Sequence, residues 1–442
     1  MKVIKSSVST VLLGSMVFLA ACSSTGSDTG TKPAGNNAAE SGAEKKSVTI
    51  TAAVQKHSAI DALQALLPEF EKETGIKVKF EVLPQEEQDA KVELTLASGS
   101  DQYDVFLLDH MYTPKYAKAN WIEDLSPFIE KNKSTININD FMQGYVSALS
   151  YEGKVYALPL YGESTMLMYN KELFEKAGIA KAPTTFDELK EAAAKLTKDG
   201  HYGIVMRGQR GAGMNVYTWA GFYNAFGAKW LVDGKPAVNS DAAVQATQLY
   251  ADLITKYGPP GGANFSWDQV QLAVQQGTVA MAIDATNFAA RLENPENSKV
   301  VGKMGYAFVP KGPNGSSPSS ATRGFAIPKT SKNKEAAFQF IQWALSEKIQ
   351  TKTALEGLRA DTTRVSVWNN EEYKKKFNFD NGNWIKVAVD SMNQADGEYR
   401  PRIPQWKQMG DGLGIAVSSV LSGVSAKEAL DKAQKDIEKY FK

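Results

Sequence analysis

Apolar and polar residues follow two different periods along the chain from residue 47 onward. Alternating or continuous apolar runs are typical of strands, whereas apolar residues three or four positions apart are typical of helices. The strand pattern occurs at 47–54, 76–83, 103–109, 278–284 and 324–328. Strands that alternate with helices predict a mostly parallel sheet with helices on both faces. We therefore expect an α/β body that is long enough for two lobes.

The predicted helices carry recognisable start and stop signals. Ser58 is placed to cap the first helix and Gly75 to end it, while Pro68 should kink or shorten it. Thr185 and Glu188 form a capping-box pattern before the next clear amphipathic run. Further helix starts are expected at Ser240, Ser266 and Ser425, and another helix over 86–97.

The first 46 residues have a different composition from the rest. Lys2 and Lys5 precede a short apolar run, which is typical of a secretory signal peptide over residues 1–21. The stretch "LAAC" ending at Cys22 resembles a bacterial lipobox, so we expect Cys22 to be lipidated and to anchor the protein to the cell membrane. Residues 22–46 are almost entirely small or polar, and we interpret them as a flexible linker.

Composition and motifs exclude several classes of function. The 442 residues carry 50 Lys and Arg against 49 Asp and Glu, so no net field attracts nucleic acid. A single Cys excludes an intramolecular disulfide and a thiolate metal centre. The nucleophile-elbow, zincin and P-loop patterns are absent. Three histidines leave a metal site open, and 49 acids leave a two-carboxylate glycosidase open.

Polar side chains follow four of the predicted strands. They are Gln55 to His57, Asp109 with His110, Glu163, and Asp284 with Asn287. In open α/β sheets, ligands bind beyond the carboxyl ends of the strands. Each position alone can equally be a helix cap or a solvated loop, but four together favour a binding cleft.

Aromatic residues accompany these polar positions, among them Tyr161, Tyr217, Trp219 and Phe325. Carboxylates accept from neighbouring hydroxyls, amides donate and accept, and aromatic faces pack against C–H groups. This combination suits a neutral sugar or sugar alcohol. Glu163, with no catalytic partner recognisable in the sequence, is interpreted as a hydrogen-bond acceptor rather than a catalytic acid.

The chain resembles the family 1 extracellular solute-binding proteins of ABC carbohydrate importers. The matching strings include "LPEFEKETGIKVKFEVLP", "YEGKVYALPLYGESTMLMYNKELFEKAGI", "VQQGTVAMAID" and "RPRIPQW", in the family's order. "RGQRGAGMNVYTWAGFYNAFG" is most similar to the branch that binds sugar alcohols and small sugars. The resemblance implies a two-lobed periplasmic-binding-protein-like fold (type II), with the ligand cleft between the lobes.

The resemblance also implies domain bounds and site residues. The N-lobe would comprise 46–160 plus 324–360, and the C-lobe 161–323 plus 361–442. The implied ligand-binding residues are His57, Asp109, His110, Tyr161, Glu163, Asn215, Tyr217, Trp219, Asp284, Asn287, Arg323, Phe325 and Arg364. Many relatives have Gly-Trp-Gly where this chain has Arg323-Gly324-Phe325, so Arg323 is expected to reach a ligand hydroxyl or carboxylate.

Together these features predict a lipid-anchored, monomeric substrate-binding subunit of an ABC importer. It would close two lobes around a sugar, sugar alcohol or short oligosaccharide and deliver it to a transmembrane permease. No cofactor, metal or nucleic acid is expected. The alternatives are a secreted carbohydrate-active enzyme, a lipoprotein without a role in transport, and a binding protein for a charged solute such as a polyamine or sugar acid.

Overall fold

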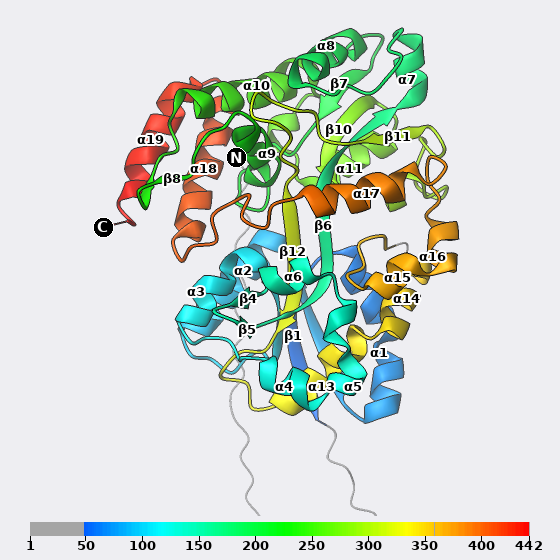
Figure 1. The fold of residues 1–442 in the computed structure, drawn as a ribbon, viewed down its shortest axis with the longest axis vertical. Coiled ribbons are helices and arrows are strands. Elements are labelled where there is room, and N and C mark those ends of the chain that lie inside the picture. The colour runs from blue at the N-terminus through cyan, green and yellow to red at the C-terminus, as the bar shows by residue number, and fades with distance from the viewer. Residues whose placement is uncertain (1–47, 358, 442) are drawn as a thin grey trace, which may run out of the picture. The chain divides into compact units, whose positions relative to one another are not determined.

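A mixed sheet of eight strands organises the part of the chain that the computed structural model describes, residues 48–357 and 359–441 (Figure 1). The strand order is β2-β1-β3-β12-β6-β10-β7, and β11 also pairs with β6. These strands are β1 (Thr49–Gln55), β2 (Lys77–Leu83), β3 (Val105–Asp109), β6 (Leu158–Asn170), β7 (Tyr202–Val205), β10 (Val279–Ala285), β11 (Met304–Ala307) and β12 (Ser320–Ala326). Two small hairpins lie outside the sheet, formed by β4 (Ser150–Tyr151) with β5 (Lys154–Val155) and β8 (Leu231–Val232) with β9 (Lys235–Pro236).

Helices occupy most of the chain between the strands. Before β6 they are α1 (Ser58–Thr74), α2 (Gln85–Ala97), α3 (Thr113–Lys118), α4 (Ser126–Lys131), α5 (Lys133–Ile136) and α6 (Gln143–Ala148). Between β6 and β12 they are α7 (Lys171–Lys176), α8 (Phe186–Leu196), α9 (Asn215–Ala225), α10 (Asp241–Tyr257), α11 (Trp267–Gln275) and α12 (Phe288–Leu292). After β12 they are α13 (Lys334–Ala344), α14 (Glu347–Glu356), α15 (Val365–Asn369), α16 (Glu371–Lys376), α17 (Asn383–Gln394), α18 (Trp406–Leu421) and α19 (Ala426–Glu438). Short 3-10 turns are η1 (His110–Tyr112), η2 (Ile138–Asp140) and η3 (Gly262–Asn264).

The predicted strands exist, but the expectation of a mostly parallel sheet is wrong. β1 runs parallel to β2 and β3, and β7 runs parallel to β10. β12 is antiparallel to β3 and to β6, and β6 is antiparallel to β10 and β11. The antiparallel pairs of this sheet are the four that involve β6 or β12, and the alternation of strands and helices along the chain does not fix the direction in which such strands pair.

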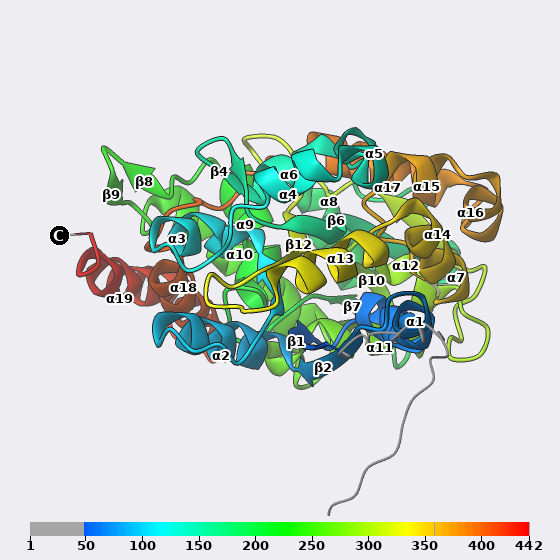
Figure 2. The same cartoon turned by 90° about the horizontal axis from the view of Figure 1, so that it is seen from below.

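Helices cover both faces of the sheet, as the alternation of buried residues along β3 indicates. Val105 and Leu107 pack in the core beneath α1 and α13, whereas Phe106 and Leu108 pack in the core beneath α2. Successive side chains of a strand point to opposite faces, so both faces of β3 are buried. Seen from below, α2 and α13 lie on opposite sides of the first strands (Figure 2).

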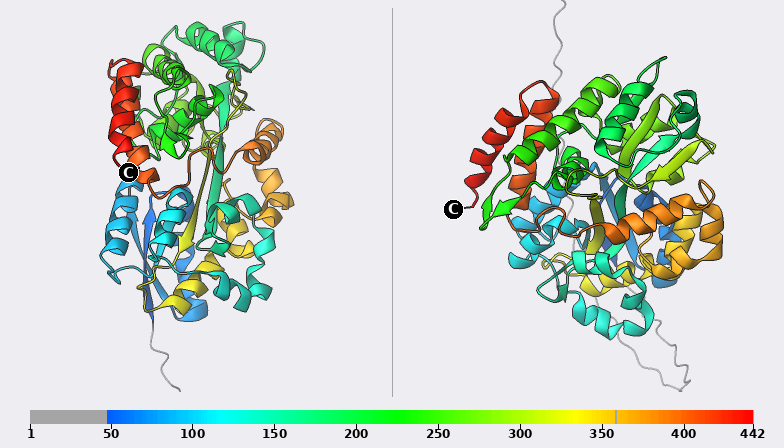
Figure 3. Two further views of the ribbon diagram at one scale, coloured as in Figure 1. Left: turned by 60° about the vertical axis from the view of Figure 1, so that its left-hand side comes forward. Right: turned by 45° about the horizontal axis from the view of Figure 1, so that its top comes forward.

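The long strand β6 connects two groups of strands. The first group is β1, β2, β3 and β12, and the second group is β7, β10 and β11. The first part of β6 pairs with β12, up to Ser164, and its last part pairs with β10 and β11, from Thr165 onward. In the left view of Figure 3, β6 and β12 run side by side through the middle of the body. The register of β6 and β12 shifts between Arg323 and Gly324, where Leu160 has no partner on β12. Such a bulge bends a strand locally.

This bulge lies where the sequence predicts the lobes to meet, because the expected boundaries 160/161 and 323/324 fall inside β6 and β12. The described residues, from Val48 onward, form a single compact unit. The division into an N-lobe and a C-lobe therefore stays a prediction. The signal peptide, Cys22 and the whole linker 22–46 lie outside the described residues.

The first helix differs in two ways from its prediction. His57, not Ser58, is its N-cap: the His57 side chain accepts from the backbone N–H of Ala59. The helix also continues through Pro68 and ends at Gly75, which has a left-handed φ of 73°. Its inner face, including Leu63 and Phe70, is fully buried, and this packing maintains the helix across the proline.

The other predicted caps are present. Thr185, Ser240 and Ser425 each accept from a backbone N–H two or three residues into the following helix. Ser266 and Gln269 form a complete capping box, whereas Glu188 bonds to Thr184 instead of returning to Thr185. Within the described residues, no helix is long and apolar enough to cross a membrane.

Candidate functional site

A buried cavity lies where the strand ends of both groups converge. Its wall is formed by Gln55, His57, Ser58, Gln85, Asp109, Tyr161, Glu163, Arg207, Gly213, Tyr217, Trp267, Gln271, Asn287, Phe288, Arg291, Ala321, Arg323, Ala360 and Arg400. The cavity has a volume of about 60 Å³, which is room for a few water molecules. Seven of the thirteen predicted site residues belong to this wall: His57, Asp109, Tyr161, Glu163, Tyr217, Asn287 and Arg323.

One side of the cavity is built from the end of β1 and the middle of β6. The ring of His57 stacks on Tyr161 with 4.1 Å between ring centroids and 10° between planes. Gln55 donates from Nε2 to the Tyr161 hydroxyl. Burial lowers the pKa of His57 to about 4, although nearby Asp361 opposes the shift. His57 is therefore a neutral, aromatic part of the wall at neutral pH.

Glu163 lies within β6, opposite Ala321 of β12, and only 9% of its surface is exposed. Its carboxyl group makes no hydrogen bond to the residues that the structure describes. Burial raises the pKa of Glu163 to about 8; Arg207 opposes this shift, while Asp284 and Asp361 add to it. A carboxyl group in this state has hydrogen-bonding capacity left for a ligand.

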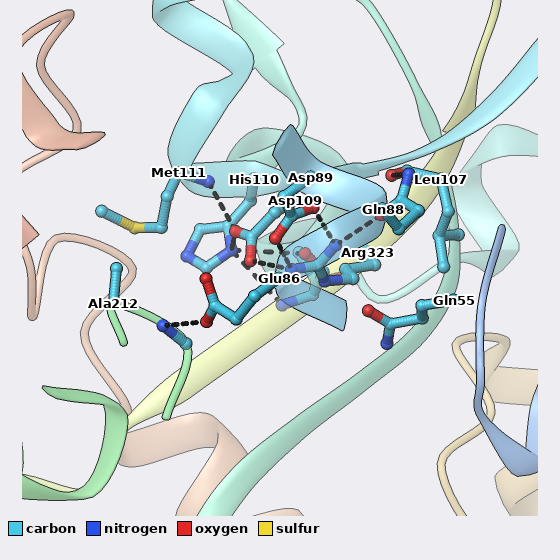
Figure 4. Close-up of polar contacts among 12 residues, drawn as sticks. Gln55, Glu86, Gln88, Asp89, Leu107, Asp109, His110, Met111, Ala212 and Arg323 are labelled. Carbon is cyan, nitrogen blue, oxygen red and sulfur yellow. Dashed lines mark hydrogen bonds and ion pairs between the residues drawn. The ribbon is translucent and has the colours of Figure 1, made fainter. Parts of the chain in front are cut away.

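The Arg323 guanidinium is held by the carboxylates of Asp89 on α2 and Asp109 at the end of β3 (Figure 4). Its two terminal nitrogens each lie 2.7 Å from an oxygen of Asp89, and Nη2 donates to Asp109 at 2.9 Å. Asp109 also accepts from the backbone N–H of Met111 and lies 3.1 Å from Nδ1 of His110. Burial works against the charge of Asp109, but Arg323 and His110 hold its pKa below the usual range.

On the opposite side, Arg207 is fixed in the same manner by Asp284. Nη2 of Arg207 donates to Asp284 at 2.5 Å, and Nε lies 3.0 and 3.1 Å from the two carboxylate oxygens. The guanidinium carbon lies 4.4 Å from the centre of the Tyr217 ring. Asp284 itself is fully buried behind Arg207 and does not reach the wall. In this structure Asp284 supports Arg207, and its predicted contact with a ligand stays a prediction.

Five more predicted site residues lie outside the wall. His110 is buried beside Asp109, and its Nδ1 lies 3.2 Å from the carbonyl of Thr322. Asn215 starts α9 and ties the glycine-rich loop before it, donating to the carbonyl of Gly414 and accepting from the N–H of Gly211. The polar atoms of Asn215 are thus directed at the protein itself, whereas Nε2 of His110 is a buried atom without a partner among the described residues. The predicted ligand contacts of both residues stay predictions.

Trp219 and Phe325 are corrected to core residues. Trp219 is fully buried in α9 and donates from Nε1 to Thr247 at 3.0 Å. Phe325 packs against Phe340 with ring centroids 5.4 Å apart. Each faces a helix rather than the cavity. The sequence does not reveal this, because the two faces of an element cannot be told apart when both are apolar and buried.

Arg364 is also a structural residue. It donates to Asp140 and to the carbonyls of Ile136 and Leu345, and its guanidinium lies 4.1 Å from the ring centre of Phe141. These contacts join the segment after α14 to the region before α6. Arg364 lies outside the cavity wall, and its predicted contact with a ligand stays a prediction.

The sequence interpretation missed three arginines of the wall: Arg207, Arg291 and Arg400. Arg207 follows β7, so the rule that ligands bind beyond strand ends, which identified Glu163, also applies to Arg207. It was missed because β7 has only four residues and gives a weak strand pattern. Arg400 was within a recognised string, "RPRIPQW", without being chosen. Its guanidinium lies over Tyr217 and Tyr399 and donates to the carbonyl of Ala212. Among residues 48–357 and 359–441, no group of His, Cys, Asp and Glu is arranged to hold a metal.

Comparison with known proteins identifies the family. The model of the bacterial extracellular solute-binding protein family matches residues 56–351, and the chain belongs to that family. The predicted family is thus confirmed, and it consists of solute-binding proteins rather than enzymes. Membership of this extracellular family confirms the predicted extracellular location, while the lipid anchor stays a prediction.

Solved structures confirm the α/β solute-binding-protein fold. A solute-binding protein from Agrobacterium radiobacter K84 in complex with ribitol is 31% identical, with a TM-score of 0.84 over 89% of this chain and 98% of the other. One from Agrobacterium vitis S4 with bound D-mannitol is 32% identical, with a TM-score of 0.81 and the same coverage. A mannitol-binding protein of Pseudomonas aeruginosa is 27% identical over 416 residues, 89% of this chain and 93% of its own.

Proposed function

We propose that the protein is the substrate-binding subunit of an ABC importer and captures a small sugar alcohol or sugar in the cavity around Glu163. Similar proteins with this fold are described as ABC transporter solute-binding proteins and hold ribitol or D-mannitol. The small cavity favours a single short ligand over an oligosaccharide.

Buried polar atoms without a protein partner carry this proposal. Within the described residues these include Oε1 of Gln55, the Tyr217 hydroxyl and Oδ1 of Asn287, all on side chains of the cavity wall. An unpartnered buried polar atom costs about 1–3 kcal/mol, so such atoms are rare unless a ligand or water satisfies them. Hydroxyl groups both donate and accept, and several of them along one short chain satisfy this set together with Glu163.

The charges around the cavity favour a neutral ligand. Arg207 is balanced by Asp284, and Arg323 by Asp89 and Asp109. Arg291 and Arg400 form no ion pair in the described part of the chain, and this favours a sugar acid as the second candidate. A polyamine is disfavoured because it would be repelled by the same two arginines.

The remaining features of the proposal concern delivery. Lipidation at Cys22 and the linker 22–46 would hold the body near the membrane, where the closed form docks on a permease. Lobe closure would bend the body at the bulge of β6 and β12, because hinge motion concentrates where regular strand pairing is interrupted. The protein acts as a monomer in this proposal.

Isothermal titration of the purified protein with ribitol, D-mannitol, their monosaccharide counterparts, the matching sugar acids and spermidine tests the proposal. We expect heat of binding and a raised melting temperature with at least one polyol or sugar, and recovery of the unchanged ligand. Binding of a sugar acid alone would replace the neutral ligand with the second candidate. Binding of spermidine alone, or chemical conversion of a sugar, would overturn the proposal.

A further inference from the structure

Asp361 is a buried carboxylate behind the cavity that touches two of its wall residues. It lies between α14 and α15 and is 2% exposed. Its Oδ2 lies 3.6 Å from Nε2 of His57 and accepts from Nδ2 of Asn287 at 3.3 Å. His57 follows β1 in the first group of strands, and Asn287 follows β10 in the second. A single oxygen atom thus connects the two sides of the cavity.

The contact determines which atoms Asn287 and His57 present. Because Nδ2 of Asn287 is used by Asp361, its Oδ1 is the atom left without a partner in the described structure. Nδ1 of His57 accepts from the backbone N–H of Ala59, so the neutral ring carries its proton on Nε2, the nitrogen that faces Asp361. Asp361 accordingly fixes the orientation of the Asn287 amide, with Oδ1 as the unpartnered atom, and contacts the Nε2 edge of the His57 ring.

Asp361 is held in place by contacts with Arg359 and with β6 beside the bulge at Leu160. Nε of Arg359 lies 2.8 Å from Oδ1 of Asp361, and the backbone N–H of Gly162 donates to the Asp361 carbonyl. Arg359 also donates to the carbonyl of Leu160, the residue without a partner at the bulge. The position of Asp361 therefore depends on the conformation of the strand that carries Glu163.

We propose that Asp361 is a positioning residue for ligand capture, which orients Asn287 and His57 together when both sides of the cavity surround the ligand. The proposal rests on the function proposed above and adds a selectivity rule to it. Because Oδ1 of Asn287 is the atom without a partner in the described structure, a ligand group that meets this atom should be a donor, such as a hydroxyl. An ether or a carboxylate facing Oδ1 is disfavoured because it cannot donate to it.

The variant D361N tests this, with ribitol and D-mannitol as probes in isothermal titration. An amide has one acceptor oxygen and cannot serve Arg359 and both wall residues, so we expect the affinity to fall at least tenfold. D140N is the matched control, because Asp140 is also a carboxylate paired with an arginine, Arg364, but touches no wall residue. We expect D140N to bind within twofold of the wild type.

Two further measurements separate positioning from a general structural role. In the N287A background, D361N should cost much less affinity than it does alone, since the residue through which it acts is already gone. By NMR, the His57 imidazole should titrate at lower pH in D361N than in the wild type, because the carboxylate that favours its charged form is removed. With only three histidines in the chain, H57Q assigns the signal.

The outcomes are distinct for the two proposals. Full affinity of a folded D361N, additive losses in the double variant, or an unchanged His57 titration would each overturn the role of Asp361. If the wild type binds no polyol or sugar of the panel, the proposed ligand class is overturned, while the His57 titration still tests the Asp361 contact without any ligand.

Discussion

Two buried polar clusters in this protein contain the same kinds of groups but differ in how those groups are satisfied. Around Arg364, the guanidinium donates to Asp140 and to two carbonyls, and Asp140 also accepts from the backbone and hydroxyl of Ser366. Around Glu163, by contrast, wall residues such as Asn287 keep a buried polar atom without a partner in the described structure. The satisfied cluster holds segments together, and the unsatisfied one has capacity for a ligand. Burial and charge alone do not separate the two.

The largest effect is expected from R364A. Removing one partner of a buried ion pair leaves Asp140 uncompensated and should lower the free energy of unfolding by about 3–5 kcal/mol. Urea denaturation measures this loss. The affinity of the remaining folded protein for its ligand should stay within twofold. A large loss of affinity at nearly unchanged stability would instead place Arg364 in the binding site and break the comparison.

The converse change is E163A. Loss of a buried hydrogen-bonding partner should weaken ligand binding by about 1–3 kcal/mol, which is tenfold or more for most of that range. Stability should not fall, because the carboxyl group has no partner among the described residues to lose. Isothermal titration and urea denaturation of the same preparation measure both quantities. Unchanged affinity in a folded E163A would remove Glu163 from the site.

The pH dependence of stability sharpens the same contrast. The folded pKa of Glu163, about 8, lies above its ordinary value of 4.5, so the folded state binds more protons than the unfolded state between these values. Stability should therefore decrease as the pH rises from about 4.5 to 8, by at least about 1 kcal/mol. Glu86, whose pKa burial raises to about 7, acts in the same direction.

Denaturation curves of the wild type and E163Q from pH 5 to pH 8.5 measure this dependence. E163Q cannot ionise at that position, so its stability should fall less across the range than that of the wild type. Parallel profiles for the two proteins would mean that Glu163 is ionised in the folded state at neutral pH, with a neighbour that compensates its charge.

The smallest effect is expected from W219F. The substitution removes the Nε1 hydrogen bond to Thr247 and leaves a small void, and should lower stability by about 1 kcal/mol. Ligand affinity should not change, because Trp219 is not part of the cavity wall. Thermal denaturation with and without ligand checks both expectations. A lost ligand response with a native melting temperature would return Trp219 to the site.

Sequence periodicity predicted five of the eight strands in the main sheet of the described residues and several of the longer helices, but not how the strands are paired. The runs that became β1, β2 and β3 were identified because apolar periodicity and turn residues are local properties. The antiparallel insertion of β12 between β3 and β6 was not, because it depends on contacts between residues more than 150 positions apart. The first helix was predicted to be kinked or shortened at Pro68, and it is not shortened, since packing of its inner face is a tertiary effect.

The candidate site was predicted only in part, for a physical reason that Trp219 and Tyr217 illustrate. Both lie on α9, two residues apart, and both are buried, yet only Tyr217 reaches the cavity. Sequence position placed both near the site but could not give the direction of the side chain. Arg207 and Arg400 were missed because their surroundings, Asp284 and the tyrosine rings, come from distant segments.

The cavity wall is assembled from many short, separate stretches of chain, from Gln55 near one end to Arg400 near the other. No single stretch of chain supplies most of this wall. Exchanging one side chain at a time can therefore change which solute is accepted while the scaffold is left alone. A protein built in this way is a favourable starting point for laboratory evolution toward new uptake substrates, through a handful of point substitutions rather than grafted loops.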